Sequence, residues 1–180
     1  MTEILFVRHG ETDWNVEHRV QGHSDRPLNA TGEQQARTLA EDLRSERIDA
    51  VYASDLSRAS ETARIVAEER GLEVVVLPAL REKNFGTWEG LLDSEIFERF
   101  PHAREGPWGD GEGTEEVAER VVTALHEIAD RHPGGRVLVV SHGGPLRAVL
   151  RHCSVGADGH IANCHVARIA FREGALLSLD

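Results

Sequence analysis

Short apolar runs alternate with amphipathic segments along the first half of the chain. The β-branched and aromatic run Ile4 to Val7 predicts a buried strand that ends before Arg8. The capping-box pattern Thr31-Gly32-Glu33-Gln34 is followed by apolar residues at helical spacing, which predicts a helix over about residues 31–45. Two further strands are predicted over 48–52 and 74–77, with a helix over 57–70 between them that ends at Gly71.

The pattern breaks in the middle of the chain and then resumes. Glycine, proline and aromatic residues become frequent after Pro78, and we expect residues 83–113 to cross the sheet as a lid-like excursion, with a short helix near 94–100 and Trp88 and Trp108 packed beneath it. The remaining predicted elements are a helix over 114–131, a buried strand over 137–140, a helix over 145–152 that starts at Pro145, and a terminal hairpin of strands over 166–171 and 175–179.

Strands that alternate with helices are typical of βαβ units and of a mostly parallel sheet that is covered on both faces. We therefore predict an α/β protein, a three-layer α/β/α sandwich whose mostly parallel sheet has an antiparallel edge strand. The chain has 180 residues and shows no internal repeat or low-complexity tract, so residues 1–180 are expected to form a single domain.

Composition and charge exclude several classes of protein. With 40% hydrophobic residues the chain is too apolar for a disordered protein, and no apolar run approaches the roughly 18 residues of a membrane span. The 20 Lys and Arg residues against 31 Asp and Glu residues give a net charge of −11, which argues against a broad nucleic-acid surface but leaves room for a small phosphorylated ligand where a few cations converge.

The amino terminus lacks the features of a secretory signal, so a cytoplasmic protein is expected, and Cys153 and Cys164 are expected to be free thiols.

Polar residues that follow the predicted strands carry the candidate chemistry. In open α/β sheets, ligands bind beyond the carboxyl ends of the strands, so residues from separate strands meet at one edge. The residues at that edge are Arg8, His9 and Gly10 after the first strand, Ser54, Asp55 and Arg58 after the second, Arg81 and Glu82 after the third, and His142, Gly143 and Gly144 after the strand over 137–140. Two histidines, three arginines and a glutamate are therefore expected to converge in an otherwise acidic chain.

This set of side chains suits phosphoryl transfer. The transferred group carries its charge on three oxygens, which the guanidinium groups of Arg8 and Arg58 can bind. One histidine can attack phosphorus, and we expect the neighbouring cations to lower its pKa and keep it neutral. Glu82 is placed to protonate the leaving oxygen, although Glu11 and Glu89 lie in loops that could also reach the pocket.

Several motifs, in sequence order, resemble those of one family. They are Phe6-Val7-Arg8-His9-Gly10-Glu11-Thr12 with Trp14-Asn15, Gln21-Gly22 through Asp25 to Pro27-Leu28 and Gly32, Ser54-Asp55-Leu56-Ser57-Arg58-Ala59 with Thr62-Ala63, Leu80-Arg81-Glu82 with Phe85-Gly86 and Trp88-Glu89-Gly90, and Ser141-His142-Gly143-Gly144. Together these motifs span about residues 4–170. They resemble the histidine phosphatase superfamily, also called the phosphoglycerate mutase-like family, and the resemblance implies a phosphoglycerate mutase-like fold.

The resemblance implies a role for each catalytic residue. It makes His9 the nucleophile that becomes phosphorylated and Glu82 the proton donor. It makes Arg8, Arg58 and His142 the rest of the phosphate pocket. These five residues are the predicted catalytic set.

Further residues are expected to border the phosphate or the substrate. Asn15 resembles an additional phosphate ligand of the family, and Gln21-Gly22 matches a loop that borders the substrate. The backbone N–H of Gly143 lies where the amino terminus of a helix would point at the anion. Family members work without a metal, and neither a metal nor another cofactor is expected. Cys153, His160, Cys164 and His165 match no regular zinc-site spacing.

The phosphoryl group on His9 can pass to water or to a second substrate hydroxyl. Glycolytic mutases of the family are usually longer between the acid and the second histidine, whereas Glu82 and His142 are only 60 positions apart. The segment Asn84-Phe85-Gly86-Thr87-Trp88-Glu89-Gly90 also resembles the phosphatase branch more than the mutase branch. We therefore predict a metal-independent phosphomonoesterase that acts on small phosphorylated metabolites through a phosphohistidine intermediate.

Three alternatives remain open at this point: cofactor-dependent phosphoryl transfer of the phosphoglycerate mutase type, dephosphorylation of phosphohistidine on proteins, and a sensor that binds a phosphorylated ligand without turnover. The expected partner is a small phosphorylated substrate, with no nucleic acid and no membrane, and both a monomer and a homodimer are compatible with the sequence.

Two departures from the family pattern bear on substrate choice. Gly113 stands where a hydroxyl side chain is common, and Lys83 follows the acid where an apolar residue is more usual.

Overall fold

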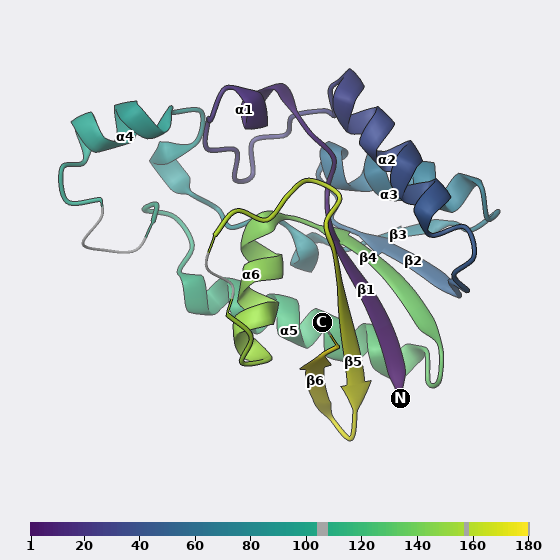
Figure 1. Cartoon of the computed structure of the whole chain (residues 1–180). Coiled ribbons are helices and arrows are strands. Elements are labelled where there is room, and N and C mark those ends of the chain that lie inside the picture. The colour runs from purple at the N-terminus through teal and green to yellow at the C-terminus, as the bar shows by residue number, and fades with distance from the viewer. Residues whose placement is uncertain (104–107, 157–158, 180) are drawn as a thin grey trace.

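A six-stranded sheet forms the centre of the computed structural model, which describes residues 1–103, 108–156 and 159–179 (Figure 1). The strands lie in the order β3-β2-β4-β1-β5-β6. Their bounds are Thr2–Arg8 for β1, Ala50–Ala53 for β2, Val74–Val76 for β3, Arg136–Ser141 for β4, Val166–Arg172 for β5 and Ala175–Ser178 for β6. Strands β1 to β4 are parallel, whereas β5 runs antiparallel to β1, and β6 antiparallel to β5. The predicted terminal hairpin is confirmed, and it forms one side of the sheet.

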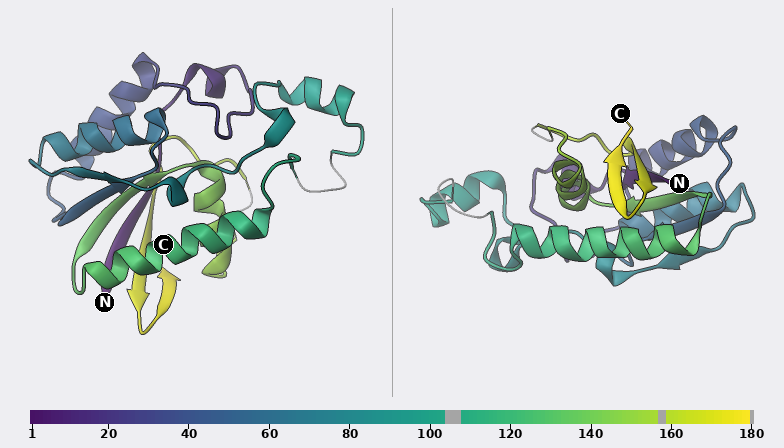
Figure 2. Two further views of the ribbon diagram at one scale, coloured as in Figure 1. Left: turned by 180° about the vertical axis from the view of Figure 1, so that it is seen from behind. Right: turned by 90° about the horizontal axis from the view of Figure 1, so that it is seen from below.

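Helices cover both faces of this sheet (Figure 2). Helices α2 (Ala30–Asp42) and α3 (Ser57–Glu68) pack on one face, and α5 (Thr114–Arg131) and α6 (Gly143–His152) pack on the other. Side chains along β1 alternate between the two layers, because successive residues of a strand point to opposite faces: Leu5 belongs to the core under α2 and α3, and Phe6 to the core under α5 and α6. The predicted three-layer sandwich is therefore confirmed.

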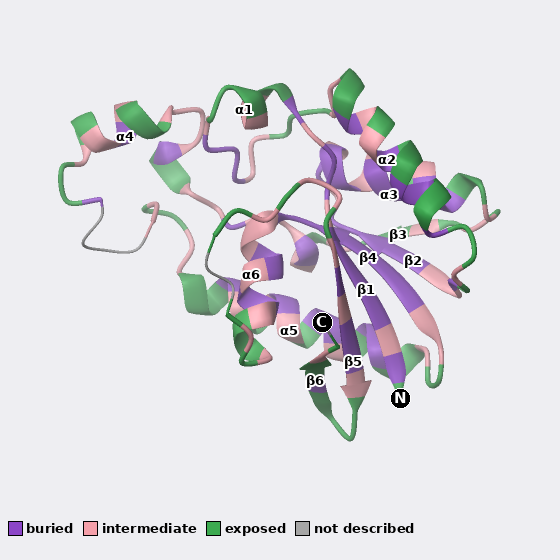
Figure 3. Cartoon of the chain, viewed as in Figure 1, coloured by how far each residue is buried: buried purple, intermediate pink, exposed green. Residues whose placement is uncertain are grey.

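Burial is greatest in the middle of the sheet. Figure 3 shows β1 and β4 buried along most of their length, and the side chains of Ile4 to Val7 and of Val137 to Val140 are fully buried. These two apolar runs are the ones from which the sequence predicts buried strands. Since β1 and β4 are neighbours in the sheet, the residues that follow them are held next to each other by the most deeply buried part of the fold.

The start of α2 differs from its prediction. Asn29, and not Thr31, is the N-cap, and its Oδ1 accepts a hydrogen bond from the backbone N–H of Gly32 at 2.8 Å. The capping box predicted on Thr31 is therefore wrong, because an amide side chain two residues earlier supplies the acceptor. Asn29 Nδ2 also donates to Glu11 Oε1 at 3.0 Å, which ties the start of α2 to the loop that follows β1.

Other helices and strands begin or end a few residues away from their predicted bounds. Helix α6 begins at Gly143, two residues before the predicted start at Pro145, and β2 extends to Ala53 through its pairing with Val140 of β4. Helix α1 (Asp13–Val16) is absent from the sequence prediction because four residues are too few to show a helical periodicity. Short 3₁₀ turns, η1 and η2, follow β3 at Pro78–Leu80 and Gly86–Trp88.

The described part of residues 83–113 shares a small apolar cluster with Val20, which contains Val20, Trp88, Ile96 and Ala103, with Phe85, Phe97, Phe100 and Trp108 packed against it. Trp88 stacks on Phe100 and meets Trp108 edge to face, each at 5.0 Å between ring centroids. The predicted short helix is α4 (Asp93–Arg99). Residues 104–107 of this stretch lie outside the described residues. The aromatic residues therefore serve as a packing core for the excursion.

Two further observations concern membrane-spanning helices and the state of the two cysteines. No helix in the described part of the chain is long and apolar enough to cross a membrane. Both Cys153 and Cys164 are free thiols, as predicted.

The buried centre of the sheet gives a first prediction. Leu138 is fully buried in β4, whereas Leu177 in β6 is 49% exposed. We expect Leu138→Ala to lower the free energy of unfolding by about 2–5 kcal/mol, because it leaves a cavity in a packed core. Leu177→Ala should lower it by less than about 0.5 kcal/mol. Urea denaturation followed by circular dichroism measures both, and equal losses would contradict this assignment of the core.

Candidate active site

Two histidines meet at the carboxyl edge of the sheet. The parallel register of β1 and β4 pairs Arg8 with Ser141, so that His9 and His142 follow at the same height. The backbone N–H of His9 donates to Ser141 O at 3.0 Å, and the two imidazole rings are 5.1 Å apart between centroids, at an interplanar angle of 62°. His9 is 2% exposed and His142 is fully buried. Strand pairing therefore produces the histidine pair that the sequence predicts.

The ring of His9 is fixed by its own backbone. His9 Nδ1 lies 2.6 Å from Gly10 O, and since a carbonyl oxygen only accepts, Nδ1 carries the proton of this hydrogen bond. In a neutral ring the lone pair then lies on Nε2. Gly10 permits a close backbone approach to α2, because a Cβ there would lie 2.5 Å from Gly32 O. Its N–H donates to Thr62 Oγ1 of α3 at 3.0 Å, which fixes the turn from a second side.

Burial and neighbouring cations keep both rings neutral. The pKa of His9 lies well below its ordinary value, first because burial removes water and then because Arg58 and Arg8 repel a proton, while the Gly10 carbonyl opposes the shift. The pKa of His142 is lowered in the same way, by burial first and then by Arg58. The sequence predicts the direction for the nucleophile from its cations alone, whereas in the structure burial is the larger cause.

The two arginines approach from different elements. Arg58, in the first turn of α3, is fully buried, and it donates from Nη2 to Gly22 O at 2.8 Å and from Nη1 to Ser24 O at 3.0 Å. Burial lowers the pKa of Arg58 to about 10, against the opposing effect of Glu82. Arg8, at the end of β1, donates from Nη1 to Ile161 O, and burial lowers its pKa as well. Both guanidinium groups are held by carbonyl groups and keep further N–H donors for a ligand.

Unpartnered nitrogen atoms gather at this point. Six buried side-chain nitrogen atoms have no hydrogen-bond partner among the described residues, and four of them are Arg8 Nε, Arg58 Nε and both ring nitrogens of His142. A neutral His142 ring has one N–H and one lone pair, so three of these four nitrogen atoms can donate, and since buried polar groups are normally satisfied, the unsatisfied donors indicate a missing acceptor. A pocket of about 370 Å³ adjoins them and is lined by Arg8, His9, Arg58 and Gly143, among others. The arrangement is that of a site for a small anion.

The predicted border residues line the same pocket. Asn15 Oδ1 accepts from the backbone N–H of Thr12 at 3.1 Å, and Gln21 Oε1 accepts from Thr12 Oγ1 at 2.9 Å. Both side-chain oxygens are thereby occupied, which leaves the amide NH₂ groups as donors towards the pocket. Gly22 has φ +53°, and a Cβ there would lie 2.1 Å from Glu89 Oε1, so this position requires glycine. Asn15, Gln21 and Gly22 all line the pocket, as do four of the five catalytic candidates: Arg8, His9, Arg58 and Glu82. His142 is not among the described residues that line it and lies behind His9, with the two rings 5.1 Å apart between centroids.

Glu82 lies at the amino terminus of α6. Its Oε2 accepts from the Gly144 N–H at 3.2 Å and its Oε1 from the Lys83 N–H at 2.8 Å. A Cβ at Gly144 would lie 2.1 Å from Glu82 Oε1, so glycine makes room for the carboxylate. The backbone carbonyl of Glu82 accepts from His23 Nε2 and from Arg120 Nη2, each at 2.9 Å. The carboxyl group therefore faces the pocket from a backbone that is held on two sides.

The other candidate acids point elsewhere. Glu89 accepts from the backbone N–H groups of His23 and Ser24, at 2.8 and 2.9 Å, and Glu11 accepts from Asn29. Neither Glu89 nor Glu11 is among the described residues that line the pocket. Of the three carboxyl groups that the sequence leaves open, only Glu82 lies in the pocket.

Arg81 does not join the cationic cluster, contrary to its prediction. Its guanidinium group forms a bidentate ion pair with Asp55, with Nε–Oδ1 2.8 Å and Nη2–Oδ2 2.5 Å. Arg81 and Asp55 both follow strands of the sheet, but they neutralise each other beside the pocket. Of the three arginines that the sequence predicts at this edge, only Arg8 and Arg58 therefore line the pocket.

Four further residues contact or line the candidate site, and the sequence prediction omits them or gives them no role. Asn163 Nδ2 donates to His9 O at 3.0 Å and to Asn15 Oδ1 at 3.3 Å, which links the predicted nucleophile to the predicted phosphate ligand. Arg120 and His23 hold the Glu82 backbone, and Arg147 lines the pocket from α6. Arg147 stands one helical turn after Gly143, a spacing that could have indicated it. Within the described residues, no three or more His, Cys, Asp or Glu side chains are grouped to hold a metal ion.

The chain is similar in sequence and in fold to known proteins of one superfamily. The profile of the histidine phosphatase superfamily (branch 1) matches residues 4–178. A phosphoglycerate mutase-like protein 4 from Arabidopsis thaliana is 44% identical over 86% of this chain and 72% of its own, and a metal-independent phosphoserine phosphatase from the same plant is 40% identical over 96% and 78%. The structure of a mycobacterial glucosyl-3-phosphoglycerate phosphatase in complex with VO₃ superimposes with a TM-score of 0.87 at 29% identity, covering 98% of this chain and 95% of the other.

The lowered pKa values of His9 and His142 predict how stability depends on pH. Below an ordinary histidine pKa of about 6.5, the unfolded chain takes up protons that the folded chain does not, so the free energy of unfolding falls as the pH is lowered from 7 to 5. Each histidine contributes up to about 1.4 kcal/mol per pH unit in this window. Denaturation at a series of pH values should show a shallower dependence for His9→Gln/His142→Gln. The exposed-residue control His152→Gln should keep the wild-type slope, and an unchanged slope in the double variant would contradict the assignment.

Proposed function

The chain belongs to the histidine phosphatase superfamily (branch 1), and we propose that it is a metal-independent phosphomonoesterase that acts on small phosphorylated metabolites. The observation that carries this proposal is the group of four unpartnered nitrogen atoms of Arg8, Arg58 and His142 beside the ring of His9. Donors in this arrangement can bind the three phosphoryl oxygens and stabilise their charge during transfer. The phosphatases among the similar proteins support the same reaction class.

In the first step, Nε2 of His9 attacks phosphorus. The N–P bond forms as the P–O ester bond breaks, and Glu82 in its protonated form gives its proton to the leaving oxygen. The products of this step are the free alcohol, a phosphorylated His9 and a Glu82 carboxylate. The Nδ1–H bond to Gly10 O holds the ring in the orientation that this attack requires.

In the second step, water releases the phosphoryl group. The Glu82 carboxylate accepts a proton from the water as its oxygen attacks phosphorus, and the N–P bond breaks. Inorganic phosphate leaves, His9 is again neutral and Glu82 is again protonated. No group beyond these side chains is needed to balance the cycle.

The structure bears on the choice between hydrolysis and mutase chemistry through the segment of residues 83–113. We propose that this segment covers the pocket, since Phe85 and Trp108 line it. Glu82 and His142 are only 60 positions apart, which leaves little room for the longer insertion of glycolytic mutases and favours water as the second acceptor. The mutase remains the second candidate, because a mutase-like protein is among the similar proteins.

A direct assay separates these two reactions. We expect the protein to release inorganic phosphate from 3-phosphoglycerate or another small phosphomonoester without any bisphosphorylated compound. Rapid interconversion of 3- and 2-phosphoglycerate in the presence of bisphosphoglycerate, with little release of phosphate, would establish the mutase instead.

The nucleophile gives the next prediction. His9→Ala should lower the turnover of every phosphomonoester by at least about a thousandfold, because it removes the atom that forms the N–P bond. The wild type should keep its activity in a metal chelator, measured as phosphate release over a panel of metabolites. Replacement of the exposed His152 by alanine is the matched control and should retain activity. Undiminished turnover in His9→Ala would refute the mechanism.

The proton donor is tested through the leaving group. Glu82→Gln should lower kcat/KM for alkyl phosphates by about 10²–10⁴-fold, because their alkoxide leaving group needs a proton. The loss should be much smaller for p-nitrophenyl phosphate, whose leaving group departs as an anion. Glu11→Gln and Glu89→Gln should show no such difference between the two kinds of ester. If one of these variants shows it and Glu82→Gln does not, the role of the acid belongs to that residue.

A further inference from the structure

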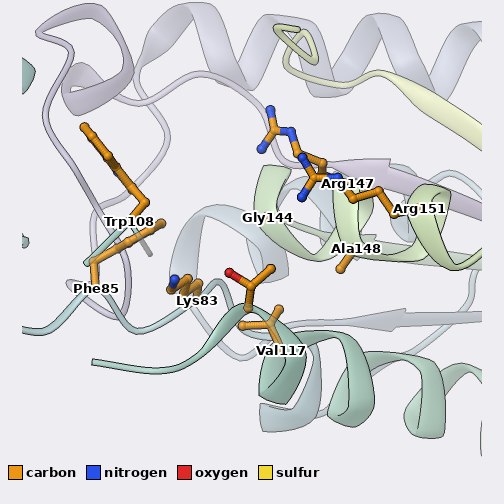
Figure 4. A pocket seen from close by; sticks show the side chains of 9 residues that line it. Lys83, Phe85, Trp108, Val117, Gly144, Arg147, Ala148 and Arg151 are labelled. Atoms are coloured by element: carbon orange, nitrogen blue, oxygen red, sulfur yellow. The ribbon is translucent and has the colours of Figure 1, made fainter. Parts of the chain in front are cut away.

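A second pocket opens beside the catalytic one. It has a volume of about 340 Å³ and shares Phe85, Trp108, Gly144 and Arg147 with the catalytic pocket (Figure 4). Its other lining residues are Lys83, Thr114, Val117, Ala148 and Arg151. The two pockets are therefore contiguous, and a substrate whose phosphate lies at His9 can extend into the second one.

Lys83 is the feature of this pocket that the catalytic cycle does not use. It is the only lysine in a chain of 180 residues, and it is only 6% exposed. In the described part of the chain, its ammonium group makes no hydrogen bond or ion pair, and it lies over the Phe85 ring, 5.8 Å from the centroid. Most of the Lys83 side chain is thus removed from water, and an ammonium group in such surroundings is unfavourable when no anion compensates for its lost hydration.

Nearby carboxylates are already engaged. Glu112 accepts from Arg120 Nε at 2.5 Å and from the Asn84 N–H at 3.1 Å, and Glu82 accepts from two backbone N–H groups. These two acids attract Lys83 at longer range, but burial outweighs them, and the pKa of Lys83 is lowered from its ordinary value. The ammonium group therefore lies in a site whose resident anions are occupied elsewhere.

The charge of the pocket contrasts with that of the whole chain. Lys83, Arg147 and Arg151 line it, and no acidic side chain is among its described lining residues, although the chain carries a net charge of −11. Figure 4 shows the aromatic side chains of Phe85 and Trp108 at one side and the two arginines at the other. Such a pocket combines apolar walls with a positive potential, which suits an organic group that carries negative charge.

We propose that this pocket binds the leaving-group part of the substrate, and that Lys83 recognises a second anionic group there, a carboxylate in the simplest case. The inference rests on the proposed phosphomonoesterase activity and narrows its substrate class to phosphomonoesters that carry a further negative charge. The hydrocarbon part of the substrate packs against Phe85, Trp108 and Val117. Lys83 supplies the charge recognition because, of the three cations that line this pocket, it is the one with a mostly buried side chain, and its ammonium group makes no hydrogen bond or ion pair within the described residues.

Matched substrates test the proposal. Phenyl phosphate and its 3- and 4-carboxyphenyl analogues differ by one carboxylate, and Lys83→Met removes the charge while keeping the length of the side chain. We expect the ratio of kcat/KM for the better carboxylated ester to that for phenyl phosphate to fall about tenfold to a hundredfold in Lys83→Met, mainly through KM. Taking this ratio within each variant cancels differences in leaving-group reactivity.

Two control variants separate charge recognition from other effects. Lys83→Arg keeps the cation and should retain most of the wild-type ratio. Arg172→Met removes a positive charge from an exposed residue outside the pocket and should leave the ratio unchanged. A ratio in Lys83→Met within twofold of the wild-type value would overturn the proposal.

Binding measurements keep this test separate from the proposed function. Calorimetry on His9→Ala and on His9→Ala/Lys83→Met measures the affinity for both kinds of ester without turnover. The proposal expects the carboxylate to strengthen binding at least about tenfold only when Lys83 is present. If the wild type hydrolyses neither ester but this difference is found, the proposed function fails and Lys83 still recognises the anion. If hydrolysis is found without the difference, the proposed function stands and the role of Lys83 is refuted.

Discussion

The parallel register that pairs Arg8 of β1 with Ser141 of β4 brings two imidazole rings to the same height at the carboxyl edge of the sheet. The packed apolar layers on both faces hold these two strands in place, so the 5.1 Å separation of the rings follows from the fold and not from contacts between the rings themselves. The same edge carries Arg58, which is fully buried without an ion-pair partner among the described residues. Burial of these donors without a full set of hydrogen bonds destabilises the folded protein. A bound phosphate would offset this cost.

Binding of an anion at this site depends on the local arrangement of donors and not on the net charge of the whole chain. A chain with a net charge of −11 gains nothing from long-range attraction of an anionic substrate, so selectivity depends on local donors. Arg8 and Arg58 are oriented by carbonyl groups, His9 by Gly10, and Glu82 by the amino terminus of α6. Each of these restraints uses backbone atoms. The site is therefore prepared before substrate arrives, which reduces the reorganisation needed during transfer.

The fold and the position of the site could be predicted from the sequence because their signals are local. Apolar runs mark β1 and β4, and the residues directly after them, His9 and His142, meet because parallel strands end at one edge. The contacts that could not be predicted join residues that are far apart in the sequence. Arg81 pairs with Asp55, 26 positions away, and Asn163 reaches a backbone carbonyl 154 positions away, so neither contact leaves a pattern along the chain. The dominance of burial over cations in the pKa of His9 likewise depends on packing that only the three-dimensional structure shows.

The identity of the phosphorylated atom tests the central claim most directly. The hydrogen bond from Nδ1 to Gly10 O leaves the lone pair of the neutral His9 ring on Nε2, the atom that we propose as the nucleophile. Protein labelled with ¹⁵N-histidine can be mixed with substrate, quenched and unfolded in alkali, where phosphohistidine survives, and then studied by ³¹P and ¹⁵N NMR. The account predicts a single phosphorylated histidine, His9, with phosphorus bonded to Nε2. Phosphorus on Nδ1, on another residue, or on no residue under conditions of active turnover would contradict it.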